Sequence, residues 1–372
     1  MNKLTQQLPK PAAMGSYSEQ DVIFLLKDLS QVQLEKSTLE REQAVQSGTH
    51  YSEMLPIEYK PSDEYLQLFH HSLDMYKQKL AIAVGTVAER ILKVKGRSIV
   101  LVSLARAGTP IGILMKRYLL QTYNLNVPHY SVSIIRGRGI DENAMRYIAQ
   151  NHPDDHVQFV DGWTGKGAIT KELNEAMLDF NSKYGMQIDD SLAVLADPGY
   201  CTDIYGTRED FLIPSACLNS TVSGLVSRTV LNDLLIGTDD FHGAKYYSEL
   251  LSEDVSNHFI DVVVSEFEHV SDEINKQVLK LETEDTRPAW KGIQDIKQIQ
   301  EDFSIENIHH VKPGVGETTR VLLRRIPWKI LVKDLNNKDL EHIFLLAKER
   351  NVPVIEYKNM SYSCCGIIKP LN

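Results

Sequence analysis

Apolar and polar residues alternate along the middle of the chain in blocks that predict strands and helices in turn. Short, mostly apolar runs, typical of strands buried on both faces of a sheet, occupy 98–103, 129–135, 156–161 and 191–197, and a fifth strand is expected at 211–217. Helical patterns fill the intervals: 65–94, a helix that Thr109 caps and Pro110 opens, and a long helix over 167–185. Strands that alternate with helices form parallel sheets with right-handed crossovers, so we predict an α/β fold.

The same pattern divides the chain into parts. The expected parts are an N-terminal extension packing on the core (1–65), a parallel-sheet core (66–269), a charged helical linker (270–300) and a smaller C-terminal α/β sandwich domain (301–372). Within the extension, Ser18 is expected to cap a helix over 21–32, and 50–62 is expected to run as an extended strap.

Composition narrows the class of protein. The chain has 372 residues, 42% of them hydrophobic and 24% charged, the balance of a globular protein. No apolar run is long enough to span a bilayer and no signal peptide is evident, so we expect a cytoplasmic protein without a membrane partner. Four cysteines are too few for a disulfide framework, and the adjacent Cys364 and Cys365 are expected to be ordinary thiols.

The charge is unevenly distributed along the chain. The formal net charge is −10, which argues against nucleic-acid binding by the whole surface. Residues 301–372, however, hold 11 Lys and Arg against 9 Asp and Glu, a net of +2, while the remaining residues hold 29 against 41, a net of −12. The C-terminal part therefore differs in electrostatic character from the rest, as a separate domain would.

The loop after the third predicted strand carries the most informative residues. The strand ends at Asp161, and the residues that lead into the next helix are Gly162, Trp163, Thr164, Gly165, Lys166 and Gly167. Glycines let backbone N–H groups approach an anion at a helix N-terminus, and Asp161 is placed to hold ribose hydroxyls. An ordinary strand–helix turn is the other interpretation, because the spacing matches neither a P-loop nor a dinucleotide fingerprint.

Three further loops follow strands of the same sheet. The first is a tight turn suited to a diphosphate, formed by Ser103, Ala105, Arg106, Ala107 and Gly108. The second is a glycine-spaced pair, Arg136 and Arg138, which we interpret as a mobile cationic lid. In the third, Asp197 is placed to reach metal-bound water and Tyr200 to stack on a base. Each is also compatible with a solvated turn, but ligands bind beyond the carboxyl ends of parallel strands, so we expect the loops to converge.

Together these loops resemble those of the type I phosphoribosyltransferase family. The resemblance implies that the 161–167 loop binds the ribose and 5-phosphate of phosphoribosyl diphosphate (PRPP) and that the 103–108 turn binds its pyrophosphate. Family members commonly have two adjacent acidic residues where this chain has Asp161 followed by Gly162.

The resemblance also implies a reaction. A phosphoribosyl group would pass from PRPP to a base-like acceptor in a homo-oligomeric enzyme, with Mg²⁺ near Asp161 and Asp197 and with pyrophosphate released. Asp161, Arg106, Arg136 and Arg138 would be the catalytic residues, and Asp197 and Tyr200 would contact the base. No side-chain nucleophile is required.

Longer stretches are similar to a bacterial subfamily encoded in tellurite-resistance and stress gene clusters, which is thought to make a nucleotide-like metabolite. They lie at 46–62, 103–112, 161–170, 195–200 and 214–229. Some members of that subfamily carry a cysteine-protease label. Here Cys201 and Cys217 lack a recognisable protease signature, and no spacing identifies a partner histidine.

The segment 314–320 at the start of a predicted helix resembles the GxNExTK motif of kink-turn-binding ribosomal proteins and pelota. This resemblance implies RNA contacts from Gly316, Glu317, Thr319 and Arg320, with Gly316 standing where the motif has Asn. A docking domain that binds no RNA is the other interpretation.

Three functions therefore remain open from the sequence. A PRPP-dependent phosphoribosyltransferase ranks first, because the arginine-bearing loops are retained. A non-catalytic PRPP sensor with an RNA-binding C-terminal domain ranks second, and a cysteine protease or other thiol hydrolase ranks last.

Overall fold

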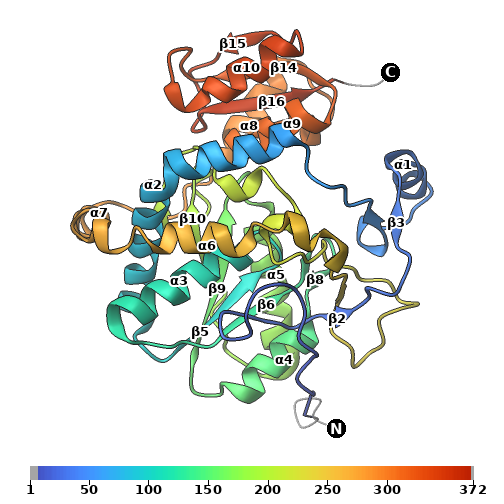
Figure 1. Cartoon of the computed structure of the whole chain (residues 1–372), viewed down its shortest axis with the longest axis vertical. Coiled ribbons are helices and arrows are strands. Elements are labelled where there is room, and N and C mark those ends of the chain that lie inside the picture. Colours follow the sequence, from blue (N-terminus) through green and yellow to red (C-terminus); the bar gives the residue numbers. More distant parts are fainter. Residues whose placement is uncertain (1–6, 370–372) are drawn as a thin grey trace.

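A six-stranded parallel sheet forms the centre of the protein in a computed structural model that describes residues 7–369 (Figure 1). The strands, in their order across the sheet, are β1 (Ile23–Phe24), β6 (His129–Val132), β5 (Ile99–Leu104), β9 (His156–Trp163), β10 (Leu192–Ala196) and β11 (Ile204–Thr207). Every neighbouring pair is parallel, so the carboxyl ends of the strands meet at one edge. The predicted α/β class with a mostly parallel sheet is confirmed.

Helices cover both faces of this sheet. One face is covered by α2 (Asp63–Lys95) and α3 (Gly108–Tyr123), with α6 (Ser256–Val264) and α7 (Ser271–Thr283) packed on them, and the other by α4 (Glu142–Asn151) and α5 (Ala168–Tyr184). Side chains of β5 alternate between the two cores: Leu101 packs with α2 and α3, and Val102 with α4 and α5. This double burial explains why the strand sequences are continuously apolar.

The C-terminal domain has its own four-stranded mixed sheet (Figure 1). Its strands, in order, are β13 (Val311–Pro313), β16 (Cys364–Ile368), β14 (Pro327–Val332) and β15 (Val354–Glu356), and its helices are α8 (Lys291–Asp302), α9 (Val315–Arg324) and α10 (Glu341–Glu349). Cys364 and Cys365 are neighbours in a strand, so their side chains enter different cores and both remain free thiols, as predicted.

Smaller elements surround the core. They are the pairs β2 (Lys27–Asp28) with β12 (Gly243–Ala244) and β3 (Glu35–Lys36) with β4 (Leu55–Pro56), the hairpin β7 (Ile134–Ile135) and β8 (Gly139–Ile140), and helix α1 (Thr38–Gln46). No helix within residues 7–369 has both the length and the apolar character needed to cross a bilayer.

Three local predictions are wrong. Residues 21–32 form β1 and β2 in place of a helix, because Phe24, Leu25 and Leu26 are all buried and the chain runs as an edge strand beside β6. The fifth strand is β11 and not 211–217, where Pro214 instead opens a short 3-10 turn. Thr109 does not cap α3; it lies inside the helix and its hydroxyl is hydrogen-bonded to that of Ser131, 2.8 Å away.

The C-terminal domain docks on the core through the carboxylate of a partly buried residue, Asp210. Asp210 accepts hydrogen bonds from the backbone N–H groups of Val315 and Ser363, at 2.9 and 2.8 Å. Burial raises the pKa of Asp210 to about 6. The long helix α2 adds a second contact, since the Tyr76 hydroxyl donates to Asp339 at 3.1 Å. These contacts place the C-terminal domain over the carboxyl edge of the parallel sheet (Figure 1).

Candidate functional site

The two central loops at the carboxyl edge lie against each other, as predicted. A Cβ at Gly108 would collide with the carbonyl oxygen of Val160 and lie 3.1 Å from the Cα of Asp161. A Cβ at Gly162 would lie 3.3 Å from the carbonyl oxygen of Ala107. The glycines here let one protein backbone approach another.

The glycine-rich loop after β9 is covered by other parts of the protein. Gly167 has φ +79°, and a Cβ there would lie 2.5 Å from the Trp290 ring and 2.9 Å from the Sγ of Cys201. The Tyr362 hydroxyl of the C-terminal domain donates to the carbonyl oxygen of Gly165 at 3.1 Å. This loop therefore joins the core to the C-terminal domain, and the PRPP contacts expected of it stay predictions.

Asp161 lies within β9, and its carboxylate accepts from the backbone N–H of Gly162 at 2.7 Å. Burial raises its pKa to about 7, and the Gly162 hydrogen bond only partly opposes this. Within residues 7–369, no group of three or more His, Cys, Asp and Glu side chains is placed to hold a metal ion. The magnesium site at Asp161 and Asp197 stays a prediction.

Asp197 is fully buried and its carboxylate already has several partners. Arg208 pairs with it at 2.6 Å, the Thr164 hydroxyl donates to it, and the backbone N–H of Cys201 donates at 2.8 Å. Burial raises its pKa to about 6. Tyr200 stacks on Arg208, whose guanidinium carbon lies 4.0 Å from the ring centroid. The predicted base contacts of Asp197 and Tyr200 would compete with these interactions.

The Arg136–Arg138 loop is the tip of the β7–β8 hairpin, and the protein holds it in place. Glu172 accepts from the backbone N–H groups of Gly137 and Gly139, at 2.7 and 2.8 Å. Arg138 pairs with Glu53 at 2.5 Å. Such anchoring is unlike the mobile lid that the sequence suggested.

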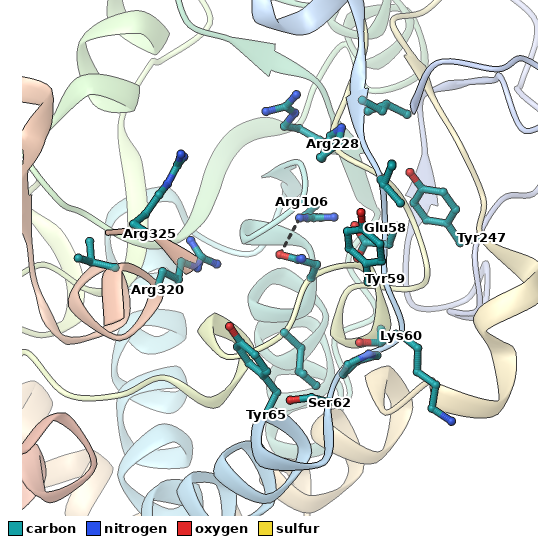
Figure 2. Close-up of a pocket in the computed structure, with 18 of the residues that line it drawn as sticks. Glu58, Tyr59, Lys60, Ser62, Tyr65, Arg106, Arg228, Tyr247, Arg320 and Arg325 are labelled. Atoms are coloured by element: carbon teal, nitrogen blue, oxygen red, sulfur yellow. Dashed lines mark hydrogen bonds between the residues drawn. The ribbon is translucent and has the colours of Figure 1, made fainter. Parts of the chain in front are cut away.

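A cleft of about 660 Å³ lies between the core, the N-terminal strap and the C-terminal domain (Figure 2). Its charged and aromatic lining residues are Arg41, Glu58, Tyr59, Lys60, Tyr65, Arg106, Arg228, Tyr247, Lys312, Glu317, Arg320 and Arg325. Seven of these are basic and two are acidic, in a chain whose net charge is −10. Among the residues predicted to bind PRPP, Arg106 lines the cleft, whereas the glycine-rich loop does not.

Core arginines form one wall of the cleft. The Nη2 of Arg228 donates to the carbonyl oxygens of Tyr51 and Met54 at 3.2 Å, while its buried Nε has no hydrogen-bond partner among the described residues. Burial, followed by the charges of Arg106 and Arg41, lowers the pKa of Arg228 to about 10. Sequence reasoning missed Arg228, although it is the lone charged residue in the segment 214–231.

The C-terminal domain supplies basic residues to the opposite wall, where Figure 2 shows Arg320 and Arg325. Lys312 of the same domain also lines the cleft. Lys166 lies outside the cleft lining, and burial, then the positive charges of Lys312 and Arg136, lower its pKa. His309 lies beside it, with Nδ1 3.4 Å from the lysine Nζ. Positive charges of the core and of the C-terminal domain therefore repel one another where the two domains meet.

The residues of the predicted RNA motif face the core. Arg320 pairs with Glu317 at 3.0 Å and donates through Nε to the carbonyl oxygen of Ala216 at 3.2 Å. A Cβ at Gly316 would lie 3.1 Å from the Ala216 side chain. Thr319 is buried and donates to the carbonyl oxygen of Val315. Glu317 and Arg320 thus line the cleft, while Gly316 and Thr319 serve packing.

All four cysteines are buried. Burial raises the pKa of Cys201 and of Cys365 to about 12, and raises that of Cys364 well above its ordinary value. These three thiols are protonated at neutral pH, the opposite of an activated nucleophile.

Comparison with known proteins identifies the family. The family model described as "Tellurite-like stress resistance cysteine protease StiP" matches residues 15–264, and the PELOTA RNA binding domain matches residues 290–370. The chain belongs to the StiP family. A curated relative, "Cysteine protease StiP" of Acinetobacter baylyi, is 33% identical over 365 residues, which cover 95% of this chain and 93% of the relative.

This result corrects the functional assignment made from the sequence. The tellurite and stress family and the pelota-like domain are confirmed. Phosphoribosyl transfer as the function and enzyme class is wrong, because the family and the curated relative are both named as cysteine proteases, the class that the sequence analysis ranked last.

Two solved structures show weak similarity. A hypothetical protein from Neisseria gonorrhoeae with bound ppGpp aligns with a TM-score of 0.20 and 14% identity, over 32% of this chain. A putative tagatose-6-phosphate ketose/aldose isomerase from Clostridium novyi aligns with a TM-score of 0.22 and 10% identity, over 79% of this chain. The chain spans 65% of the length of each.

Proposed function

We propose that this protein binds RNA in the cleft between its core and its C-terminal domain. The observation that carries the proposal is the position of Lys312, Arg320 and Arg325, which belong to the PELOTA-matched domain and line the cleft. Cations that contact phosphates supply most of the affinity for RNA. Clustered cations are stabilised further when a bound anion relieves their mutual repulsion.

The charge of the rest of the chain supports the same location. Residues outside 301–372 have a net charge of −12, which repels a polyanion. The cleft is a basic region on this acidic background, so RNA should concentrate there and not spread over the surface.

The proposal is tested by fluorescence anisotropy with a short labelled single-stranded RNA and the full-length protein. Lys312→Gln should weaken binding about 3–10-fold, because one phosphate contact is lost. Lys348→Gln, which removes an exposed lysine of the same domain outside the cleft, is the matched control and should change affinity less than about 2-fold. A wild-type protein that binds no RNA at low salt, or equal losses in the two variants, would contradict the proposal.

A second candidate is the hydrolysis of a peptide by a cysteine thiol, the activity named for the family and for the curated relative. Cys217 is the thiol nearest to the cleft along the chain, because the residues that follow it, Leu218 and Asn219, line the cleft, while its own side chain packs in the core. Cys201 and Cys365 are less suitable, since a nucleophilic thiol needs a pKa much lower than about 12.

Peptide hydrolysis predicts a simple result. Cys217→Ser should abolish cleavage of a fluorogenic peptide library, and Cys201→Ser should leave the cleavage in place. If the wild-type protein cleaves nothing, or if Cys217→Ser retains full activity, hydrolysis by Cys217 is excluded.

A further inference from the structure

Two arginines of the core, Arg106 and Arg228, line the cleft together with basic residues of the C-terminal domain (Figure 2). Arg106 belongs to the turn between β5 and α3, at the carboxyl edge of the sheet. Its Nη1 donates to the carbonyl oxygen of Val226 at 3.4 Å and its Nη2 to Asn219 at 3.3 Å. The segment that carries Arg228 therefore also holds Arg106 in position.

Arg228 is only partly satisfied by the protein. Its guanidinium stacks on the ring of Tyr51, 5.4 Å from the centroid, which fixes its orientation. The groups with the greatest effect on its pKa include Arg106 and Arg41 but no carboxylate. Its buried Nε is left without a hydrogen-bond partner among residues 7–369. A largely buried guanidinium that lines the cleft among other cations is costly unless an anion enters the cleft.

The strap across the cleft limits what can enter. Its Tyr59 is 72% exposed, and Tyr59 and Tyr65 line the same cleft as Arg106 (Figure 2). A cavity of about 660 Å³ has the size of a small-ligand site, so it admits one or two nucleotides and excludes a duplex. An exposed tyrosine offers a face on which an unpaired base can stack.

We infer that the core is part of the RNA site: a phosphate of single-stranded RNA lies between Arg106 and Arg228, with an adjacent unpaired base on Tyr59. This inference rests on the proposed function and adds to it. The C-terminal domain alone would then bind RNA weakly, and the core would make the site selective for single strands.

The test compares RNA affinities of full-length variants over a range of salt concentrations. Arg228→Gln should weaken binding of single-stranded RNA about 10-fold and lower the slope of log K against log salt by about 0.7, the value for one phosphate contact. Arg97→Gln is the matched control, because Arg97 precedes β5 at the opposite edge of the sheet. It should change affinity less than about 2-fold.

Two further variants guard against misfolding of Arg228→Gln, whose guanidinium is largely buried. Arg106→Gln should lower the salt slope by a similar amount, and Tyr59→Ala should weaken binding about 3–10-fold through loss of stacking. The same strand annealed to its complement should bind at least 10-fold more weakly than the single strand. Each variant's circular dichroism and melting curve should match the wild type before its affinity is compared.

The outcomes separate this inference from the proposed function. If Lys312→Gln weakens RNA binding while Arg106→Gln, Arg228→Gln and Tyr59→Ala do not, RNA contacts the C-terminal domain alone and the inference is overturned. Duplex and single strand bound equally would also overturn it. If a free nucleoside monophosphate binds at micromolar concentration and RNA does not, the cleft is a nucleotide site and both proposals fall.

Discussion

The loop after β5 and the loop after β9 leave the same edge of the sheet but end in different surroundings. Both contain glycines, both precede a helix, and the two touch through Gly108 and Asp161. The β9 loop is covered by Trp290 and Tyr362, whereas Arg106 in the β5 loop lines an open cleft. The β9 loop, which carries more of the predicted binding residues, is thus the one that other parts of the protein cover.

The difference shows that a glycine at such an edge of a sheet can be required for either of two structural reasons. A missing Cβ lets a phosphate approach the backbone, and it equally lets another segment of the protein approach. At Gly167 the close neighbour is the Trp290 ring, and at Gly108 it is β9 itself. Glycine spacing alone cannot distinguish these cases, but the position of an arginine at a cavity can.

Among the substitutions that test the contrast between the two loops, Gly167→Ala should have the largest effect on stability. The new Cβ would meet the Trp290 ring at 2.5 Å in a backbone with φ +79°. Strain and overpacking should together lower the free energy of unfolding by about 3–5 kcal/mol, measured by urea denaturation. Gly165→Ala is the matched control in the same loop, since its Cβ would meet no atom within 4 Å. A Gly167→Ala protein as stable as Gly165→Ala would show that the loop is open.

Asp161→Asn should have a smaller effect that depends on pH. The pKa of Asp161 is about 7 in the folded protein and about 4 in the unfolded chain, so the folded state binds the proton more tightly. Stability from this group is present below pH 4 and is lost as the pH rises to about 7 and above, by about 2–4 kcal/mol. Asparagine does not ionise, so the Asp161→Asn protein should not lose this stability as the pH rises.

Thermal melts of both proteins between pH 4 and pH 9 measure the difference. The two proteins should diverge as the pH rises, with the variant more stable at pH 8. Asp197 and Asp210 titrate near pH 6 in both proteins, so their contribution cancels. Parallel curves would mean that Asp161 is solvated and that the β9 loop is accessible.

The smallest effect on stability is expected from Arg106→Gln. Two of its hydrogen bonds, at 3.4 and 3.3 Å, are long, and the side chain lines the cleft. The free energy of unfolding should fall by less than about 1 kcal/mol. A loss above about 3 kcal/mol in the same urea experiment would mean that Arg106 holds the fold together, and the contrast between the loops would disappear.

Much of the fold is readable from single segments. The apolar runs at β5, β9 and β10 predict their strands to within about two residues, because both faces of each strand are buried. Strand β16 was missed, since Cys364–Ile368 has neither alternation nor length to mark it. The N-terminal residues 21–32 were misassigned because the consecutive buried residues Phe24, Leu25 and Leu26 give no period that separates a helix from a strand.

The candidate site was predictable only in part. Arg106 and Arg320 were predicted as site residues from local motifs and both line the cleft. Arg228, in the 214–229 stretch, and Lys312 were given no role from the sequence and line it as well. Their proximity results from docking of the C-terminal domain through Asp210, a residue whose carboxylate caps the start of α9. That contact joins positions 105 residues apart, and no local pattern encodes it.

The sequence by itself determined the α/β class, the parallel sheet and the edge at which its loops gather, because strand burial and crossover handedness are properties of contiguous segments. Only the tertiary structure decided which loop is covered and which faces a cavity. The physical reason is that a cleft is defined by what packs around it: its cations come from the strap, the core and the C-terminal domain, and their repulsion arises only once folding brings them together.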